Sequence, residues 1–143
     1  MTPVIRQLNQ ENVDAVYELG IRESAFCFDR NQIGFWSKEQ LSAWFNSPAD
    51  ICLGAFVADK LVGFALVAVH SPTKKATWEN FFVKPEARGG GIGQYLEQAL
   101  RQRLKQKGVL YSHFLVSHGN IHALRYFRDR DYKECGLFSW FSF

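Results

Sequence analysis

Apolar residues recur along this chain with two different spacings, and the spacing separates expected helices from expected strands. Spacing of three to four residues predicts four helices, at residues 12–21, 37–48, 92–107 and 120–130. Asn12 is expected to cap the first helix, and the S-x-x-Q spacing from Ser37 to Gln40 resembles a capping box. Gly108 follows the third helix, where glycine is the usual stop.

Runs rich in β-branched and aromatic residues predict strands at residues 3–8, 51–58, 61–70, 76–83 and 110–116. The pair Asp59-Lys60 lies between two of these runs and predicts a tight hairpin turn. The order of elements indicates an α/β (α+β) fold with a mixed, mostly antiparallel central sheet of six to seven strands. About four helices are expected on its two faces, and residues 1–143 are expected to form one domain.

The C-terminal run LFSWFSF predicts further strand material with apolar residues on both faces. Phe138 and Trp140 fall on one face, and Leu137, Phe141 and Phe143 on the other. Such a strand is expected to be buried on both sides. Burial in a subunit interface is one way to achieve this, so homodimerisation is a hypothesis.

Composition and charge narrow the class of protein. The 143 residues carry a formal net charge of +3, which is too small to indicate nucleic-acid binding. No apolar run is long enough to cross a membrane, and we expect a cytoplasmic protein that binds neither membrane nor nucleic acid. The three cysteines are scattered and form no C-x-x-C pair, so no metal site is expected.

The stretch RGGGIG, residues 88–93, places an arginine and four glycines directly before a helix. Unpaired N–H groups at a helix start, together with the helix dipole, favour an anion, and glycines let a phosphate approach closely. The ending required by a P-loop is absent, because Gly93 is followed by Gln94 and Tyr95. A dinucleotide fingerprint fails because Leu96 stands where its third glycine is needed. A purely structural tight turn remains the alternative.

The stretch VKPEARGGGIGQYL resembles the acetyl-CoA motif of the GNAT superfamily of acyl-CoA-dependent N-acetyltransferases. Arg88, Gly91 and Gly93 stand at the positions of that motif. A second stretch, NIHALRYFRDRDY, is similar to a later segment of the family at Asn120, at Ala123 and at the aromatic pair 126–127. Asp131-Tyr132 departs from the Gly-Phe pair that usually follows.

The resemblance implies that acetyl-CoA is the cosubstrate. Its pyrophosphate is then expected on the N–H groups of Gly89, Gly90, Gly91, Ile92 and Gly93, with Arg88 nearby. The pantetheine arm is expected along the end of the 76–83 strand, where it contacts Phe81, Phe82 and Val83. Asn120 and Phe127 are expected to contact the cofactor from the opposite side.

In such proteins an amine attacks the thioester directly. Deprotonating a lysine-like amine at pH 7 costs about 4 to 5 kcal/mol, whereas a departing thiolate needs only about 2 kcal/mol of help. A general base is therefore the stronger requirement. Strand alternation places Glu79 on one face with Thr77, Phe81 and Val83, so Glu79 is the candidate base, with an ordinary surface ion pair as the alternative.

A general acid is harder to assign. Many family members carry tyrosine where this chain has Phe127, which has no proton to give. Tyr126 is adjacent but points about 100° away on a helix, so it is only a weak candidate acid. Activity without a dedicated acid is therefore expected.

The acceptor site is expected beneath residues 22–37. Glu23 and Asp29 would attract a cationic amine, and Phe28 and Trp36 would shape its pocket, although these aromatics would equally well cap the core. The expected acceptor is a small amine, polyamine-like or amino-acid-like. The alternatives are a protein or peptide N-acetyltransferase, a catalytically silent acyl-CoA-binding sensor, and an interaction module whose glycine loop is only structural.

Overall fold

The computed structural model describes residues 2–26, 34–136, 138–139 and 141. This part of the chain contains the four expected α-helices: α1 Val13–Ile21, α2 Lys38–Phe45, α3 Ile92–Gln106 and α4 Ile121–Arg128. The described residues form five strands: β1 Val4–Gln7, β2 Ile51–Val57, β3 Lys60–His70, β4 Lys75–Val83 and β5 Tyr111–His113. Within this part of the chain, no helix is long and apolar enough to cross a membrane.

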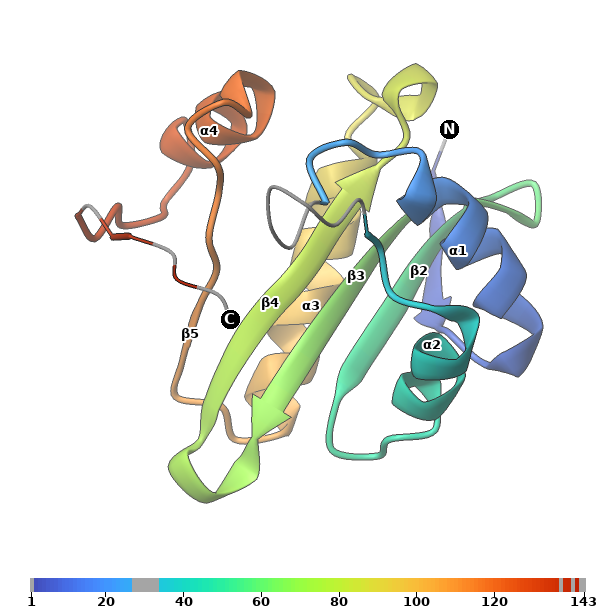
Figure 1. Ribbon diagram of the computed structural model, residues 1–143, viewed down its shortest axis with the longest axis horizontal. Helices are drawn as coiled ribbons and strands as arrows, with labels where there is room; N and C mark the ends of the chain where they lie inside the picture. Colours follow the sequence, from blue (N-terminus) through green and yellow to red (C-terminus); the bar gives the residue numbers. More distant parts are fainter. Residues whose placement is uncertain (1, 27–33, 137, 140, 142–143) are drawn as a thin grey trace.

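The strands form a single sheet in the order β1-β2-β3-β4-β5. The first three pairings are antiparallel, and only β4 and β5 run parallel. Helices α1 and α2 cover one face and α3 covers the other (Figure 1). The α+β class, the mixed sheet and the helices on both faces are thus confirmed, while the expected count of six to seven strands was too high.

Strand β3 shows why a continuous apolar run marks the centre of this sheet. Phe64 and Leu66 pack on one side with Val16 of α1 and Leu41 of α2. Because both faces are covered, the strand shows no alternation of polar and apolar residues.

The opposite face of β3 packs on α3. Ala65 and Val67 lie against Leu96 and Leu100, which recur at helical spacing. Gly108, at a φ of 72°, lies beyond the end of this helix, as expected. This packing places the first turn of α3 near the upper end of β4 (Figure 1).

Local signals at element ends were mostly accurate. Ser37 and Gln40 form the expected capping box at the start of α2. Asn12 precedes α1 but makes no capping hydrogen bond to that helix. A 3-10 turn comes before α1, and the Asn12 side chain accepts from the N–H of Asn9 at its start. The β2–β3 hairpin lies one residue earlier than expected, since Ala58 and Asp59 are its two positive-φ residues.

A β-bulge interrupts β4 at Glu79. Leu66 pairs with Asn80 and Val67 pairs with Trp78, so Glu79 is the extra residue on its strand. The expected alternation from Thr77 through Glu79 to Phe81 and Val83 was therefore wrong. Trp78 and Phe81 both pack on the α3 side, although they are three positions apart, an offset that puts side chains on opposite faces of a regular strand.

Strands β4 and β5 separate just before the bulge. Their pairing covers only three residue pairs and ends at Thr77 and His113. The strand expected at 110–116 is thus shorter than predicted, and the chain after it rises away from β4 to reach α4 (Figure 1). Side chains rather than a continued ladder fill the space between the two segments.

The C-terminal strand was a wrong prediction for the described residues. Residues 133–136, 138–139 and 141 adopt no strand conformation. Phe138 is 78% exposed and Phe141 is 90% exposed, so neither is buried within the chain. Leu137, Trp140 and Phe143, which completed the expected pattern, lie outside the described residues.

Candidate active site

A cavity of about 490 Å³ opens where β4 and the α4 segment separate. Its walls come from four parts of the chain: the residues after α1 at 23–26, the end of β4 at 81–83, the glycine loop with the start of α3 at 88–94, and the α4 segment at 120–130. The volume falls within the range of about 300–1,000 Å³ that is typical of small-molecule sites. The cavity therefore joins the two sequence stretches that were singled out independently.

The glycine loop forms one end of this cavity. Gly89 and Gly91 have φ values of 86° and 85°, a region that other residues rarely adopt. Gly91 is the N-cap of α3 and has no side chain with which to cap it, so the first N–H groups of the helix keep their hydrogen-bonding capacity. This is the local geometry of an anion site.

Gly90 differs from its two neighbours. Its backbone lies outside the left-handed region, and a Cβ added there would meet no atom within 4 Å. Nothing inside the protein therefore requires glycine at this position. Gly90 is itself absent from the described lining of the cavity, whereas Gly89 and Gly91 on either side of it belong to that lining.

Arg88 bridges the loop and the end of β4. Its Nε donates to the Val83 carbonyl at 2.7 Å, and its Nη2 lies 3.9 Å from Glu23 Oε2. Its guanidinium also lies 5.9 Å from the centre of the Phe82 ring. Arg88 thus lines the cavity with its terminal nitrogens facing Glu23.

The opposite wall begins at Asn120, the N-cap of α4. Its side-chain oxygen accepts from the Ala123 N–H at 3.2 Å, which explains why asparagine stands at this position. Asn120 lines the cavity opposite β4. It is thus on the side from which a cofactor contact was expected.

Tyr126 lines the cavity, but its hydroxyl is already engaged. It donates to Glu97 of α3 at 3.2 Å, and Glu97 also pairs with Arg101 at 3.2 Å and with Arg130 at 3.9 Å. The Arg130 guanidinium lies 3.4 Å from the centre of the Tyr126 ring. Burial, followed by the Glu97 charge, raises the pKa of Tyr126 to about 12, which makes it a weaker acid than free tyrosine.

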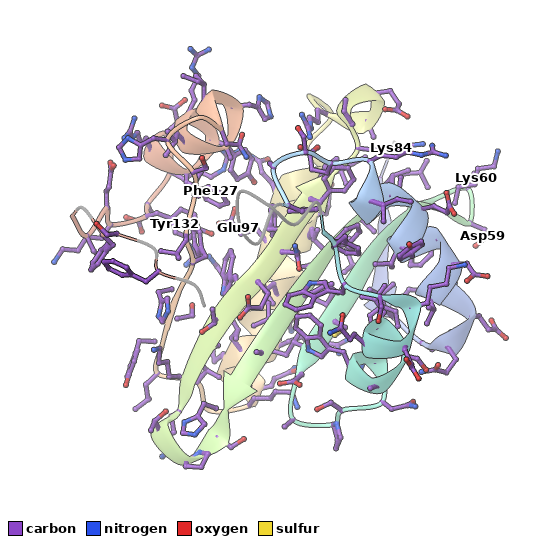
Figure 2. The ribbon with its side chains drawn as sticks, in the orientation of Figure 1. Asp59, Lys60, Lys84, Glu97, Phe127 and Tyr132 are labelled. Atoms are coloured by element: carbon purple, nitrogen blue, oxygen red, sulfur yellow. The ribbon has the colours of Figure 1, made fainter. Side chains whose placement is uncertain are left out.

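Phe127 belongs to an aromatic cluster that occupies the space between β4 and the α4 segment. Its ring centre is 4.5 Å from Phe114, 5.2 Å from Tyr132 and 6.1 Å from Phe81. In the view of Figure 2, Phe127 and Tyr132 both lie to the left of Glu97. The cluster holds α4 in place and gives the cavity a hydrocarbon surface at Phe81 and Phe127.

Glu79, the candidate base, lies on the bulge and is exposed. It is not among the residues that line the cavity. Loss of hydration nevertheless raises the pKa of its carboxyl, which is the direction needed for a base that works near neutral pH. Its position at the point where β4 leaves β5 is the feature that keeps it a candidate.

Of the expected acceptor residues that the structure describes, Glu23 lines the cavity and Trp36 does not. Trp36 lies elsewhere and donates from its Nε1 to Asn80 Oδ1 at 2.6 Å. Phe28 and Asp29 lie outside the described residues. Phe26 lines the cavity and also packs on the core side of Phe82, with ring centres 5.8 Å apart.

Sequence reasoning missed three polar residues. Asn80 is the one buried polar side chain of the described core, and Arg130 lines the cavity. Glu97 joins α3 to α4. An asparagine in the middle of an apolar strand was a usable signal for Asn80, whereas nothing local in the sequence indicates that Glu97 and Arg130 meet. No group of three or more His, Cys, Asp or Glu side chains suited to a metal occurs in the described part.

Comparison with known proteins decides the family. The model of the acetyltransferase (GNAT) family matches residues 13–132, which include the cavity and nearly all of the sheet. The chain belongs to this family. A comparison with curated protein sequences gives no significant match.

Solved structures of other acetyltransferases share the fold. The PaiA N-acetyltransferase from Thermoplasma acidophilum, in complex with coenzyme A, is 26% identical with a TM-score of 0.77, over 90% of this chain and 88% of that one. An aminoglycoside acetyltransferase from an uncultured soil metagenomic sample, in complex with sisomicin, is 19% identical with a TM-score of 0.76, over 99% and 96% of the chains. A ribosomal-protein-alanine N-acetyltransferase from Brucella melitensis is 20% identical with a TM-score of 0.77, over 93% and 86%. The second and third of these enzymes are named for different acceptors, an aminoglycoside and a ribosomal-protein alanine, so the fold alone does not select one.

Proposed function

We propose that this GNAT protein transfers an acetyl group from acetyl-CoA directly to the amine of a small polyamine-like or amino-acid-like molecule. The observation that carries the proposal is the cavity that joins the glycine loop to the separated end of β4. One end of it suits an anion and the middle is lined by apolar and backbone groups. This is the sequence of environments that a diphosphate followed by an extended amide-containing arm requires.

The glycine loop fits the diphosphate. Residues 89–93 offer N–H groups at the start of α3, and Gly90 leaves open space where a side chain would otherwise stand. Arg88 adds a positive charge beside them. The 26% identical GNAT structure from Thermoplasma acidophilum contains coenzyme A, which supports the same ligand here.

The end of β4 fits the arm. Phe81, Phe82 and Val83 line the cavity on a stretch where β4 has no partner on the β5 side. Free main-chain groups of a strand edge pair readily with an extended ligand that carries amides. Asn120 and Phe127 would then contact the ligand from α4.

The bound cosubstrate would supply an activated acetyl thioester, and the protein would supply proton transfer. Glu79 is the proposed base, and the raised pKa of its carboxyl suits removal of a proton from an ammonium group, directly or through water. Tyr126 is a poor acid, because its proton is shared with Glu97 and its pKa is raised to about 12. We therefore expect the thiolate, which needs little help, to leave without a dedicated side-chain acid.

A cationic amine would find one acidic side chain in this cavity. Glu23 is the one carboxylate among its described lining residues, and the Phe26 and Phe82 rings lie on the same side. A carboxylate beside aromatic rings suits an ammonium group. A peptide N-terminus is the alternative acceptor, and a silent acyl-CoA sensor is the alternative favoured by the absent acid at Phe127.

The proposed function is tested in two stages. Calorimetric titration with acetyl-CoA should show binding at micromolar strength that Arg88→Ala weakens. Thiol release should then be followed with spermidine, single amino acids, sisomicin and a peptide that begins with alanine. Turnover with a small amine supports the proposal, turnover with the peptide alone supports the alternative acceptor, and binding without turnover supports the sensor. Absence of acetyl-CoA binding refutes the enzyme and the sensor together.

The base is tested separately. Glu79→Gln removes the proton acceptor and nearly preserves the shape of the side chain, so turnover at pH 7 should slow at least about tenfold. Equal turnover in the variant and the wild type would refute the assignment of Glu79.

Homodimerisation is also proposed, because Phe138 and Phe141 are large apolar side chains that the single chain leaves exposed. Light scattering at micromolar concentration should give twice the mass of one chain, and a monomeric mass would refute the proposal.

A further inference from the structure

The described lining of the cavity carries two arginines and one carboxylate. Arg88 and Arg130 are the arginines of its described lining, and Glu23 is the one carboxylate there. That carboxylate is not free, since its Oε2 lies 3.9 Å from Arg88 Nη2 and both side chains are largely buried, at 24% and 32% exposure. The only anionic partner that a cationic acceptor finds in this lining is thus already neutralised.

Arg88 is anchored so that only its terminal nitrogens can change partner. Its Nε donates to the Val83 carbonyl at 2.7 Å, which fixes the base of the guanidinium at the end of β4. The main chain of Arg88 leads directly into the glycine loop at 89–93. A diphosphate bound on that loop would lie beside the same guanidinium that now faces Glu23.

We propose that Arg88 exchanges Glu23 for the diphosphate when acetyl-CoA binds, and that the released Glu23 carboxylate becomes the binding site for an ammonium group of the acceptor. The exchange rests on the proposed function. No covalent bond changes. The two anions compete for one guanidinium, and the diphosphate binds it more strongly because it has the greater charge and the loop N–H groups beside it. Cofactor binding thereby creates the acceptor site.

The exchange also specifies the class of acceptor. An ammonium group held by Glu23 keeps its proton, so it is not the nitrogen that attacks the thioester. The acceptor must therefore carry at least two amino groups. Val83, which anchors Arg88, lies four residues from Glu79 along β4, a rise of roughly 13 Å. A flexible polyamine of the length of spermidine suits such a separation better than a compact amino acid.

The experiment measures spermidine binding by calorimetry, with and without saturating CoA, which binds like the cosubstrate but transfers no acetyl group. In the wild type, CoA should tighten spermidine binding about tenfold, within the usual range of coupling between sites. Arg88→Gln removes the guanidinium from Glu23, whose Oε1 still accepts from the Ala25 N–H at 3.1 Å. Spermidine should then bind without CoA at least about fivefold more tightly than to the wild type, with little further effect of CoA. Glu23→Gln should bind spermidine weakly in both conditions.

Lys84→Gln is the matched control. Lys84 precedes the same loop, pairs with Glu86 at 3.8 Å and is not among the residues that line the cavity. Figure 2 shows it on the side of the molecule away from α4. This variant removes one positive charge nearby and should keep the wild-type coupling. Thermal unfolding of all the variants checks that each is folded before the titrations are compared.

Each remaining outcome overturns the exchange. Coupling that persists in Arg88→Gln would mean that the diphosphate attracts the amine directly. Spermidine binding that Arg88→Gln does not improve in the absence of CoA, or no spermidine binding in any variant, would remove Glu23 as the released site. The proposed function fails separately, through absence of acetyl-CoA binding by the wild type, whereas acetyl transfer without coupling overturns the exchange alone.

Discussion

Gly90 offers a sharp test of the glycine loop, because Gly90→Ala separates a ligand requirement from a folding requirement. The added methyl group would meet no protein atom within 4 Å, and the backbone there lies outside the left-handed region. Alanine at such a site should leave stability unchanged or raise it by about 0.4–1 kcal/mol, because it restricts the unfolded chain. By contrast, alanine at Gly89 or Gly91 must adopt a positive φ, at a cost of roughly 1–2 kcal/mol.

The effect of Gly90→Ala on binding should have the opposite sign. A methyl group in the loop holds the diphosphate away from the N–H groups and weakens one charge-assisted hydrogen bond, each worth about 1.5–3 kcal/mol. At about 1.4 kcal/mol for each factor of ten, affinity for acetyl-CoA should fall roughly 10- to 100-fold.

Two measurements on each variant decide the matter: urea unfolding and calorimetric titration with acetyl-CoA. Gly108→Ala is the matched control, since Gly108 has a φ of 72° and open space but lies at the far end of α3. It should be less stable and bind acetyl-CoA normally, the reverse of Gly90→Ala. If the affinity of Gly90→Ala for acetyl-CoA is within twofold of the wild-type affinity, Gly90 is not needed for ligand binding.

Three further predictions concern side chains around the site. Phe127→Tyr should change turnover less than tenfold, in a steady-state assay, because a thiolate needs only about 2 kcal/mol of help. Because the pKa of the Glu79 carboxyl is raised, the folded protein binds the carboxyl proton more tightly than the unfolded chain does. The free energy of unfolding therefore falls as the pH rises from the pKa of the unfolded chain through the pKa of the folded protein. Glu79→Gln cannot lose this proton. In urea unfolding, the stability of the variant minus that of the wild type should therefore be larger at pH 7 than at pH 4. Trp36→Phe leaves the Asn80 oxygen without its donor and should destabilise the fold by about 1–3 kcal/mol in urea, with part of the loss recovered by adding Asn80→Leu.

Elements whose signals are local were predictable from the sequence. The capping box of Ser37 and Gln40, the apolar stripe of α3 and the doubly buried run of β3 each depend on residues a few positions apart, and each was found. The glycine loop belongs to the same group, because a strand, glycines and a helix in succession determine its geometry. The geometry of the glycine loop was therefore predictable, whereas its use as a cofactor site stays a prediction.

Features that depend on distant partners were not predictable. The bulge at Glu79 reflects the register between β3 and β4, which one strand alone does not encode, and it shifts every later residue of β4 to the opposite face. The partners of Tyr126 and Trp36 come from α3 and β4, 29 and 44 residues away. The aromatic C-terminal run satisfied a strand pattern, yet its described phenylalanines find no partner surface within the chain.

Helix α4 has few contacts with the sheet, which affects the order in which parts of the molecule unfold locally. None of its residues is buried, and it is held through the Tyr126–Glu97 contact and the ring cluster around Phe127 rather than by a sheet ladder. In native-state hydrogen exchange, α4 should therefore form a low-stability unit that opens while β2, β3 and α3 stay protected. A ligand that spans from the glycine loop to Asn120 would tie this unit to the rest, so slowed exchange in α4 would report occupancy of the cavity before any product is formed.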